Sequence, residues 1–141
     1  MDTPLRFRDA PVPDEPAVSL DAFLDQPNAA SVRIEAGDDV RRLAPVLGRV
    51  RLAEVDFPKF RDGRGFSSAR VLREMGYTGE IKATGDVLVD LIYFMRRCGF
   101  DSFAPDVPFD DDAVHAALTR FPYVYQHAAD PAVPIWKLRH G

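Results

Sequence analysis

The chain has 141 residues, of which 46% are hydrophobic and 28% charged, and its formal net charge is −4. This length fits one domain with one sizeable core, and the composition excludes a disordered tail or a fibre. The acidic balance argues against a general nucleic-acid binder, whose field is dominated by clustered Lys and Arg. No apolar run approaches the ~20 residues of a membrane span, and the start of the chain lacks the apolar segment of a signal peptide. We therefore expect a cytoplasmic protein that binds neither nucleic acid nor a membrane.

Residues 1–30 contain five of the twelve prolines and no sustained apolar period. This pattern predicts an extended N-terminal arm with one short helical turn around Ser19 to Leu24. At the other end, residues 127–141 form a proline-rich tail that is too short to have its own core. We expect the tail to pack either on its own α/β domain, residues 31–126, or on a partner subunit in a homodimer.

Residues 31–126 alternate between strand-like and helix-like patterns. The strands are expected at 31–36, 50–57, 79–84 and 101–104, and the helices at 38–43, 67–75, 86–97 and 110–120. Asp38 or Asp39 is the expected N-cap of the first helix, Ser67 or Ser68 caps the second, and Gly76 ends it. About four βα units in succession indicate an α/β fold with a mostly parallel sheet. The pattern leaves open whether this sheet is an open three-layer structure or curves like part of a barrel.

The loop after the second strand is unusually basic. Residues 59–73 contain five cations and one anion, a local charge of +4 in an acidic protein. Ligands of parallel α/β proteins bind at the carboxyl ends of strands, so this loop and residues 83–86 should share one edge. Glycines there permit unusual backbone conformations, a helix start offers free N–H groups, and the arginine fork matches an oxyanion. The predicted anion-binding residues are Lys59, Arg61, Gly63, Arg64, Gly65, Ser67 and Arg70.

Two aspartates at the same strand ends, Asp56 and Asp86, are candidate catalytic groups that act as a base or orient the anion. A structural interpretation stays open for the whole stretch. In it, Gly63 lies in a turn, Ser67 is a helix cap, the arginines are solvated or pair with acids, and Asp56 caps a nearby turn. The glycines do not form a dinucleotide fingerprint, because the third glycine is missing and the loop lies too far past the strand.

The helix expected from Asp86 onward has two distinct faces. Leu88, Leu91, Ile92, Met95 and Cys98 form its apolar face, which we assign to the core. The opposite face is a polar seam that either borders the site or is solvated, and it consists of Asp86, Asp90, Tyr93 and Arg97.

The single cysteine and the histidines limit the chemistry of the chain. One cysteine excludes an internal disulfide and dithiol redox chemistry, and a position on an apolar helix face keeps Cys98 inert. The histidines lack the close pairing of a helical metal site, so no metal site is predicted. No flavin, nicotinamide, haem or cluster motif is visible, and the cofactor is unknown.

Residues 55–103 resemble the bacterial domain-of-unknown-function family 934, with a weaker echo at Tyr125-Gln126. One position departs from the pattern: Leu91 stands where the family often has glutamine. The matching motifs are Phe57-Pro58, Asp62-Gly63-Arg64-Gly65-Phe66-Ser67, Ala69-Arg70, Gly76-Tyr77-Thr78-Gly79, Gly85-Asp86-Val87, Asp90 and Gly99-Phe100-Asp101.

Members of this family look like small cytoplasmic proteins, and they are often encoded beside enzymes of assimilatory sulfate and sulfite reduction. They are commonly labelled oxidoreductases of sulfite reduction. The resemblance implies a place in sulfite reduction, a small oxyanion such as sulfite as ligand, and sulfite reductase or another sulfur-assimilation enzyme as partner. Electron transfer would require a borrowed cofactor. Two roles follow: an accessory enzyme or oxyanion-handling protein, and a non-catalytic partner that aids assembly of the reductase.

Overall fold

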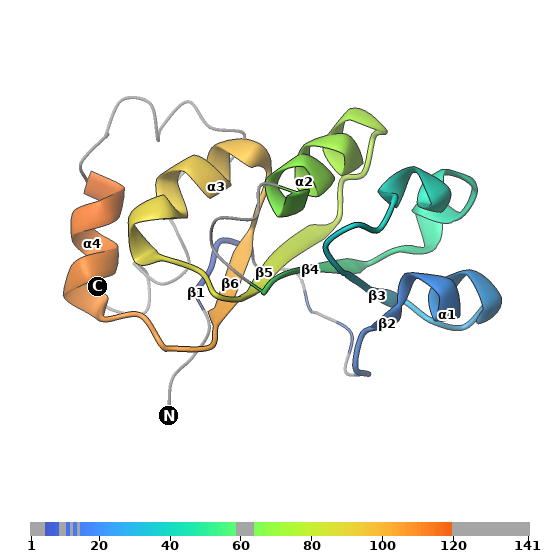
Figure 1. Ribbon diagram of the computed structural model, residues 1–141, viewed down its shortest axis with the longest axis horizontal. Helices are drawn as coiled ribbons and strands as arrows, with labels where there is room; N and C mark the ends of the chain where they lie inside the picture. The colour runs from blue at the N-terminus through green and yellow to red at the C-terminus, as the bar shows by residue number, and fades with distance from the viewer. Residues whose placement is uncertain (1–4, 9–10, 12, 14, 59–63, 120–141) are drawn as a thin grey trace.

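The computed structural model describes residues 5–8, 11, 13, 15–58 and 64–119. They form one six-stranded sheet in the order β1-β6-β5-β4-β3-β2 (Figure 1). Strands β2 to β6 run parallel to one another, and β1 runs antiparallel to β6. The predicted mostly parallel sheet is confirmed. The strands are β1 Leu5–Arg6, β2 Val18–Ser19, β3 Ser31–Ile34, β4 Leu52–Phe57, β5 Glu80–Gly85 and β6 Ser102–Pro105.

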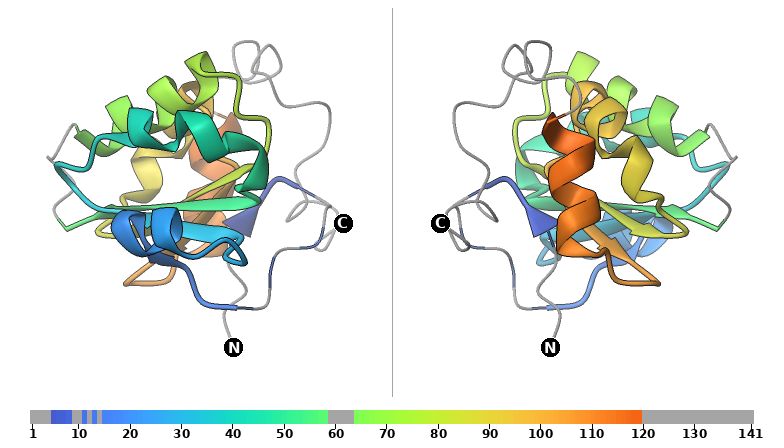
Figure 2. Two further views of the ribbon diagram at one scale, coloured as in Figure 1. Left: turned by 90° about the vertical axis from the view of Figure 1, so that its right-hand side faces the viewer. Right: turned by 90° about the vertical axis from the view of Figure 1, so that its left-hand side faces the viewer.

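The helices of the described residues form a single layer. Each contacts the next along the chain, from α1 to η1, α2, α3 and α4, and Figure 2 shows α1 and η1 at one end and α4 at the other. The reason is the strand order, because parallel strands added in chain order through right-handed crossovers place every helix on one face. The described residues thus form two layers, not the three layers of an open doubly wound sheet. The helices are α1 Leu20–Asp25, η1 Val40–Arg49, α2 Arg64–Glu74, η2 Val89–Leu91, α3 Ile92–Cys98 and α4 Asp111–Thr119, η denoting a 3₁₀ helix.

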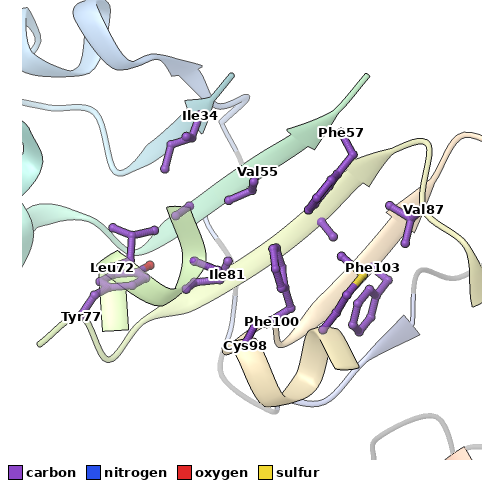
Figure 3. Close-up of a cluster of buried hydrophobic side chains, with 14 of the residues drawn as sticks. Ile34, Val55, Phe57, Leu72, Tyr77, Ile81, Val87, Cys98, Phe100 and Phe103 are labelled. Atoms are coloured by element: carbon purple, nitrogen blue, oxygen red, sulfur yellow. The ribbon is translucent and has the colours of Figure 1, made fainter. Parts of the chain in front are cut away.

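The hydrophobic core lies between the sheet and this helix layer. Alternate residues of β3, β4, β5 and β6 point into it, and Figure 3 shows the cluster that they form. Its centre is aromatic: the Phe57 ring lies 5.2 Å from Phe66 of α2 and 5.7 Å from Phe100. Such offset ring contacts add to the stabilisation from burial alone. The core therefore fixes α2 over the end of β4.

The other face of the sheet, which we call the helix-free face, is polar. No helix of the described residues covers it, and ordinary parallel sheets are apolar on both faces. Lys82 lies opposite Glu54 in the register and 3.8 Å from its carboxylate. Charged and hydroxyl side chains alternate with the core residues here, namely Ser31, Arg33, Glu54, Asp56, Glu80, Lys82, Thr84 and Ser102.

The described part of the first thirty residues contains strands and a helix, where the prolines predict an extended arm. It contributes β1, β2 and α1, and Phe7 is buried against Phe103 with ring centroids 6.2 Å apart. Two-residue strands are too short to show a periodicity, which is why the sequence did not predict them. The short helical turn was correctly expected: it is α1, capped by the Ser19 hydroxyl, which accepts from the Ala22 N–H at 3.1 Å. Residues 127–141, the expected tail, lie outside the described residues.

The first expected helix is a 3₁₀ helix, η1, and it extends past Pro45. Asp39 caps it by accepting from the Arg41 N–H at 3.0 Å. Val46, directly after the proline, has non-helical angles, so η1 consists of two helical segments joined by a kink at this point. Gly76 follows the end of α2 with φ of 99°, as expected of a C-terminal stop.

Two helix starts differ from the predictions. Helix α2 begins at Arg64, three residues before the expected cap, because Gly65 lets the first turn approach β4: a β-carbon there would lie 2.4 Å from the Phe57 ring. The next helix begins later than expected, at η2 and α3. Asp86 donates its N–H to the Phe57 carbonyl at 2.7 Å, and Val87 is buried, so this segment crosses the strand end before it turns.

Candidate functional site

The carboxyl ends of the parallel strands meet at one edge, which we call the carboxyl edge. Phe57 at the end of β4 pairs with Gly85 at the end of β5, and Gly85 pairs with Pro105 of β6. The next residues continue this contact, because the Asp106 N–H donates to the Gly85 carbonyl at 2.9 Å. The basic loop and the segment Thr84–Asp86 therefore both leave the sheet at this edge.

The first turn of α2 lies at the carboxyl edge. Gly65 packs directly on Phe57, which holds the first turn of α2, whose N–H groups have no acceptor within the helix, above the end of β4. Arg64 is exposed, and its Nη1 atom lies 3.6 Å from the position that a β-carbon on Gly37 would occupy. Gly37 belongs to the loop after β3. The Arg64 guanidinium thus reaches from α2 to the neighbouring strand-end loop.

The predicted anion-binding residues divide into three groups. Lys59, Arg61 and Gly63 lie outside the described residues. Arg64, Gly65 and Ser67 lie together in the first turn of α2, but Ser67 is not the cap, because the helix begins at Arg64.

Arg70 lies farther along α2, near the C-terminal end of α3. Its positive charge, with that of Arg97, lowers the pKa of the Cys98 thiol, although burial raises that pKa by more. Arg70 is therefore near Cys98, away from the first turn of α2. Cys98 itself is buried, and the net upward pKa shift keeps it a neutral thiol.

Asp56 lies on the helix-free face at the carboxyl edge. Its Oδ1 accepts from the Thr84 hydroxyl at 3.1 Å and lies 3.7 Å from Nη2 of Arg33. A β-carbon on Gly85 would lie 2.9 Å from the same Oδ1 and 2.5 Å from the Phe57 carbonyl oxygen, so only glycine fits there. These contacts hold the carboxylate in place. Asp56 and the first turn of α2 thus share an edge of the sheet but lie on opposite faces of it.

The four residues of the expected polar seam do not lie on one helix face. Asp86 precedes η2, because the helix starts later than predicted, and Asp90 is in the 3₁₀ turn. In α3, the Arg97 Nη1 atom donates to the Tyr93 hydroxyl at 3.1 Å, an i,i+4 pair on the helix surface. Leu88, which was expected on the apolar face of this helix, precedes η2 and is 39% exposed.

Sequence reasoning missed a polar network at the opposite edge of the sheet, the amino edge. We call it the Asp101 network. Arg73 of α2 donates to the Gly99 carbonyl and to the Asp101 carboxylate, both at 2.7 Å. Arg8 and Arg96 contact the same carboxylate at 2.9 and 3.4 Å. Charge-assisted hydrogen bonds of this kind are among the strongest in proteins.

The same network explains two of the glycine motifs. Arg73 also donates to the carbonyls of Tyr77 and Gly79, at 2.9 and 2.8 Å. The buried Tyr77 hydroxyl donates to the Glu80 carbonyl at 2.9 Å, and burial raises the pKa of Tyr77 well above its ordinary value. A β-carbon on Gly79 would overlap this hydroxyl, and one on Gly99 would lie 2.8 Å from Arg73. The spacing of Gly76-Tyr77-Thr78-Gly79 and Gly99-Phe100-Asp101 was the available signal for this network.

The described residues contain no group of three or more His, Cys, Asp or Glu side chains placed to hold a metal ion. Among these residues, no helix is long and apolar enough to cross a membrane.

Together, the fold and the site define a two-layer α/β protein in which a helix start with an exposed arginine lies at the carboxyl edge of a parallel sheet. The chain belongs to the bacterial family of unknown function DUF934, whose model matches residues 31–136. The resemblance found in the sequence is thereby confirmed. No curated protein and no solved structure matches the chain.

Proposed function

We propose that the protein is an accessory protein of assimilatory sulfite reduction that binds a small oxyanion such as sulfite at the carboxyl edge. The pathway comes from the family resemblance, and the ligand class comes from the charges and the helix start. The single observation that supports the binding role is the position of α2. Its first turn follows the basic loop directly and is held against Phe57 by Gly65, beside the exposed Arg64.

The chemistry of an oxyanion site fits these groups. Free N–H groups at a helix start and a guanidinium fork both bind oxygen atoms of an anion. Lys59 and Arg61 of the preceding loop add positive charge. Asp86, which leaves the same edge, orients the bound anion, while Asp56 keeps Arg33 and Thr84 in place beneath it.

The resemblance also implies an oxidoreductase activity. In this proposal a partner protein, and not this chain, carries out the redox reaction. The chain's own thiol, Cys98, is buried with a raised pKa and has no second cysteine with which to form a disulfide. Electrons would therefore pass through a cofactor held by another protein. We assign binding and delivery of the oxyanion to this chain.

Calorimetric titration with sulfite and with sulfate tests the binding role. Arg64→Ala removes one charged donor, and we expect it to weaken sulfite binding about tenfold. Arg41→Ala is the matched control, because Arg41 is an exposed arginine of η1 whose side chain is 69% accessible. In amide NMR spectra, sulfite should shift the Gly65 and Phe66 signals. Wild-type protein that binds neither anion would refute the proposal.

A second role, docking on sulfite reductase without catalysis, is favoured by one exposed aromatic residue. Phe94 of α3 is 51% exposed, and its ring lies 5.3 Å from Phe66 in the first turn of α2. Aromatic side chains are enriched in protein interfaces. Co-purification with the reductase that is lost in Phe94→Ser, and kept when Val107, another exposed apolar residue, is changed to Ser, would support docking. Docking without oxyanion binding would replace the first role.

A further inference from the structure

A hollow of about 330 Å³ lies at the amino edge. The proposed oxyanion site lies at the opposite, carboxyl edge of the sheet. Three segments line it: the end of η1 with the residues before β4, the turn before β5, and Arg8 after β1. Its volume is at the lower end of the range for small-molecule sites. The proposed function uses none of these residues.

The hollow is positively charged. Arg8 and Arg51 both line it, and the exposed Arg51 has no ion-pair or hydrogen-bond partner for its side chain among the described residues. The one acid among the lining residues, Glu80, already has partners for its carboxylate. Arg6 contacts its carboxylate at 2.7 Å, and the Ser102 hydroxyl donates to it at 2.7 Å. A negatively charged group entering the hollow would thus meet the exposed guanidinium of Arg51 and that of Arg8, which also contacts Asp101 at 2.9 Å, and no unpaired carboxylate of the lining.

Backbone donors add to this charge. Within the described residues, the N–H groups of Thr78 and Gly79 have no acceptor, and both residues line the hollow. Two arginines fix the turn that contains Thr78 and Gly79. Arg8 donates to the Thr78 carbonyl at 2.9 Å, and Arg73 donates to the Gly79 carbonyl at 2.8 Å. Successive free N–H groups in a fixed turn form an anion-binding concavity.

The rest of the lining is apolar. Val50 and Tyr77 are buried core residues that face it, and Leu47 is half-buried beside them. Gly48 completes this wall, and a β-carbon on it would meet no atom within 4 Å. The hollow therefore combines an anion-binding side with an apolar side.

We propose that this hollow is a second binding site, for a small organic anion. The ligand's carboxylate or phosphate group is held by Arg51, Arg8 and the N–H groups of Thr78 and Gly79, and its apolar body packs against Leu47, Val50 and Tyr77. A bare inorganic anion fills only the charged part, so this site selects a different class of ligand from the oxyanion site at the carboxyl edge.

Amide NMR titration of the full chain with phenyl phosphate and with benzoate tests the site. We expect saturable shifts at Thr78 and Gly79, with at least about tenfold weaker binding for inorganic phosphate and for acetate, which lack the apolar body. Arg51→Ala should weaken binding of phenyl phosphate about tenfold. This variant leaves the contacts of the described residues in place, since the Arg51 side chain is exposed and bonds to none of them.

A second variant tests the cavity itself without changing any charge. Gly48→Leu adds a bulky side chain to the wall of the hollow, and we expect it to abolish the shifts at Thr78 and Gly79, whereas Gly48→Ala should keep them. Arg41→Ala and Arg64→Ala, both outside the hollow, should bind phenyl phosphate like the wild type. Absence of saturable shifts at Thr78 and Gly79, or full binding by both Arg51→Ala and Gly48→Leu, would overturn the proposal. Because sulfite binding is read at Gly65 and Phe66, each site can fail independently of the other.

Discussion

The two edges of the sheet use their charged residues in opposite ways. At the amino edge, Arg73 and Arg96 are turned inward and bound to Asp101 and to main-chain carbonyls. At the carboxyl edge, Arg64 is exposed at the start of α2, and close backbone approaches are made possible by Gly65 and Gly85. Arginine content alone does not identify a site. The two edges differ in exposure: Arg96 is buried and bound to Asp101, whereas Arg64 is exposed to solvent.

The largest expected effect comes from breaking the Asp101 network. Asp101→Ala leaves the guanidinium groups of Arg73 and Arg96 without their common carboxylate, and Arg96 is almost completely buried. Removing one partner of a buried ion pair costs about 3–5 kcal/mol. Urea unfolding should show this loss in the free energy of unfolding.

The control for that variant is an exposed ion pair. Glu35→Ala removes a contact of 2.9 Å with Arg33 in which both side chains are about half exposed, 51% and 47%. We expect a change below about 1 kcal/mol. Equal effects of the two variants would show that the Asp101 network is not the brace inferred for the amino edge.

The next effect concerns a glycine of the carboxyl edge. Gly85→Ala combines a φ of 91° with a β-carbon 2.5 Å from the Phe57 carbonyl oxygen, and we expect a loss of about 2–3 kcal/mol in unfolding free energy. Gly76→Ala is the matched control, because Gly76 has a similar φ of 99° but no atom within 4 Å of the added carbon. It should lose about 1 kcal/mol. Similar losses would mean that backbone angle alone, and not the approach of β4, requires glycine at position 85.

The smallest effect is pH dependent and returns to the amino edge. Burial raises the pKa of Tyr77 in the folded protein, while the unfolded chain ionises near pH 10. Above that pH the unfolded state binds fewer protons than the folded state, so wild-type stability falls as pH rises, by up to about 1.4 kcal/mol per pH unit. Tyr77→Phe should lack this component. It should also cost about 1 kcal/mol at pH 8, where the lost hydroxyl no longer donates to Glu80.

Urea unfolding of the wild type and Tyr77→Phe at pH 8, 10 and 11 measures this difference. The two stabilities should converge as pH rises. A constant gap across the series would show that Tyr77 is accessible enough to ionise in the folded state.

The sequence predicted the long, periodic elements and missed the short or strained ones. Strands β4 and β5 were expected within a residue or two, because apolar and polar residues alternate along them. Strands β1 and β2 have two residues each, and their place in the sheet depends on tertiary contacts such as that of Arg6 with Glu80. A local sequence pattern holds no information about contacts between residues so far apart in the chain.

The candidate site was predictable in outline only. Parallel topology placed the segments around Asp56 and Asp86 at one edge, and the register of β4 with β5 accounts for it. The sequence did not indicate that α2 starts at Arg64, because that start depends on Gly65 lying against the Phe57 ring. Nor did it separate Arg70 from Arg64, since a charge count ignores where each side chain lies around a helix.

The length of the outermost strands has a consequence for how this protein behaves at high concentration. A parallel sheet normally presents a row of unsatisfied amides and carbonyls along each border, where a neighbouring molecule can add a strand. Here both border strands, β1 and β2, are two residues long, and such short borders offer little template for intermolecular pairing. The margins of the sheet therefore disfavour association by strand addition.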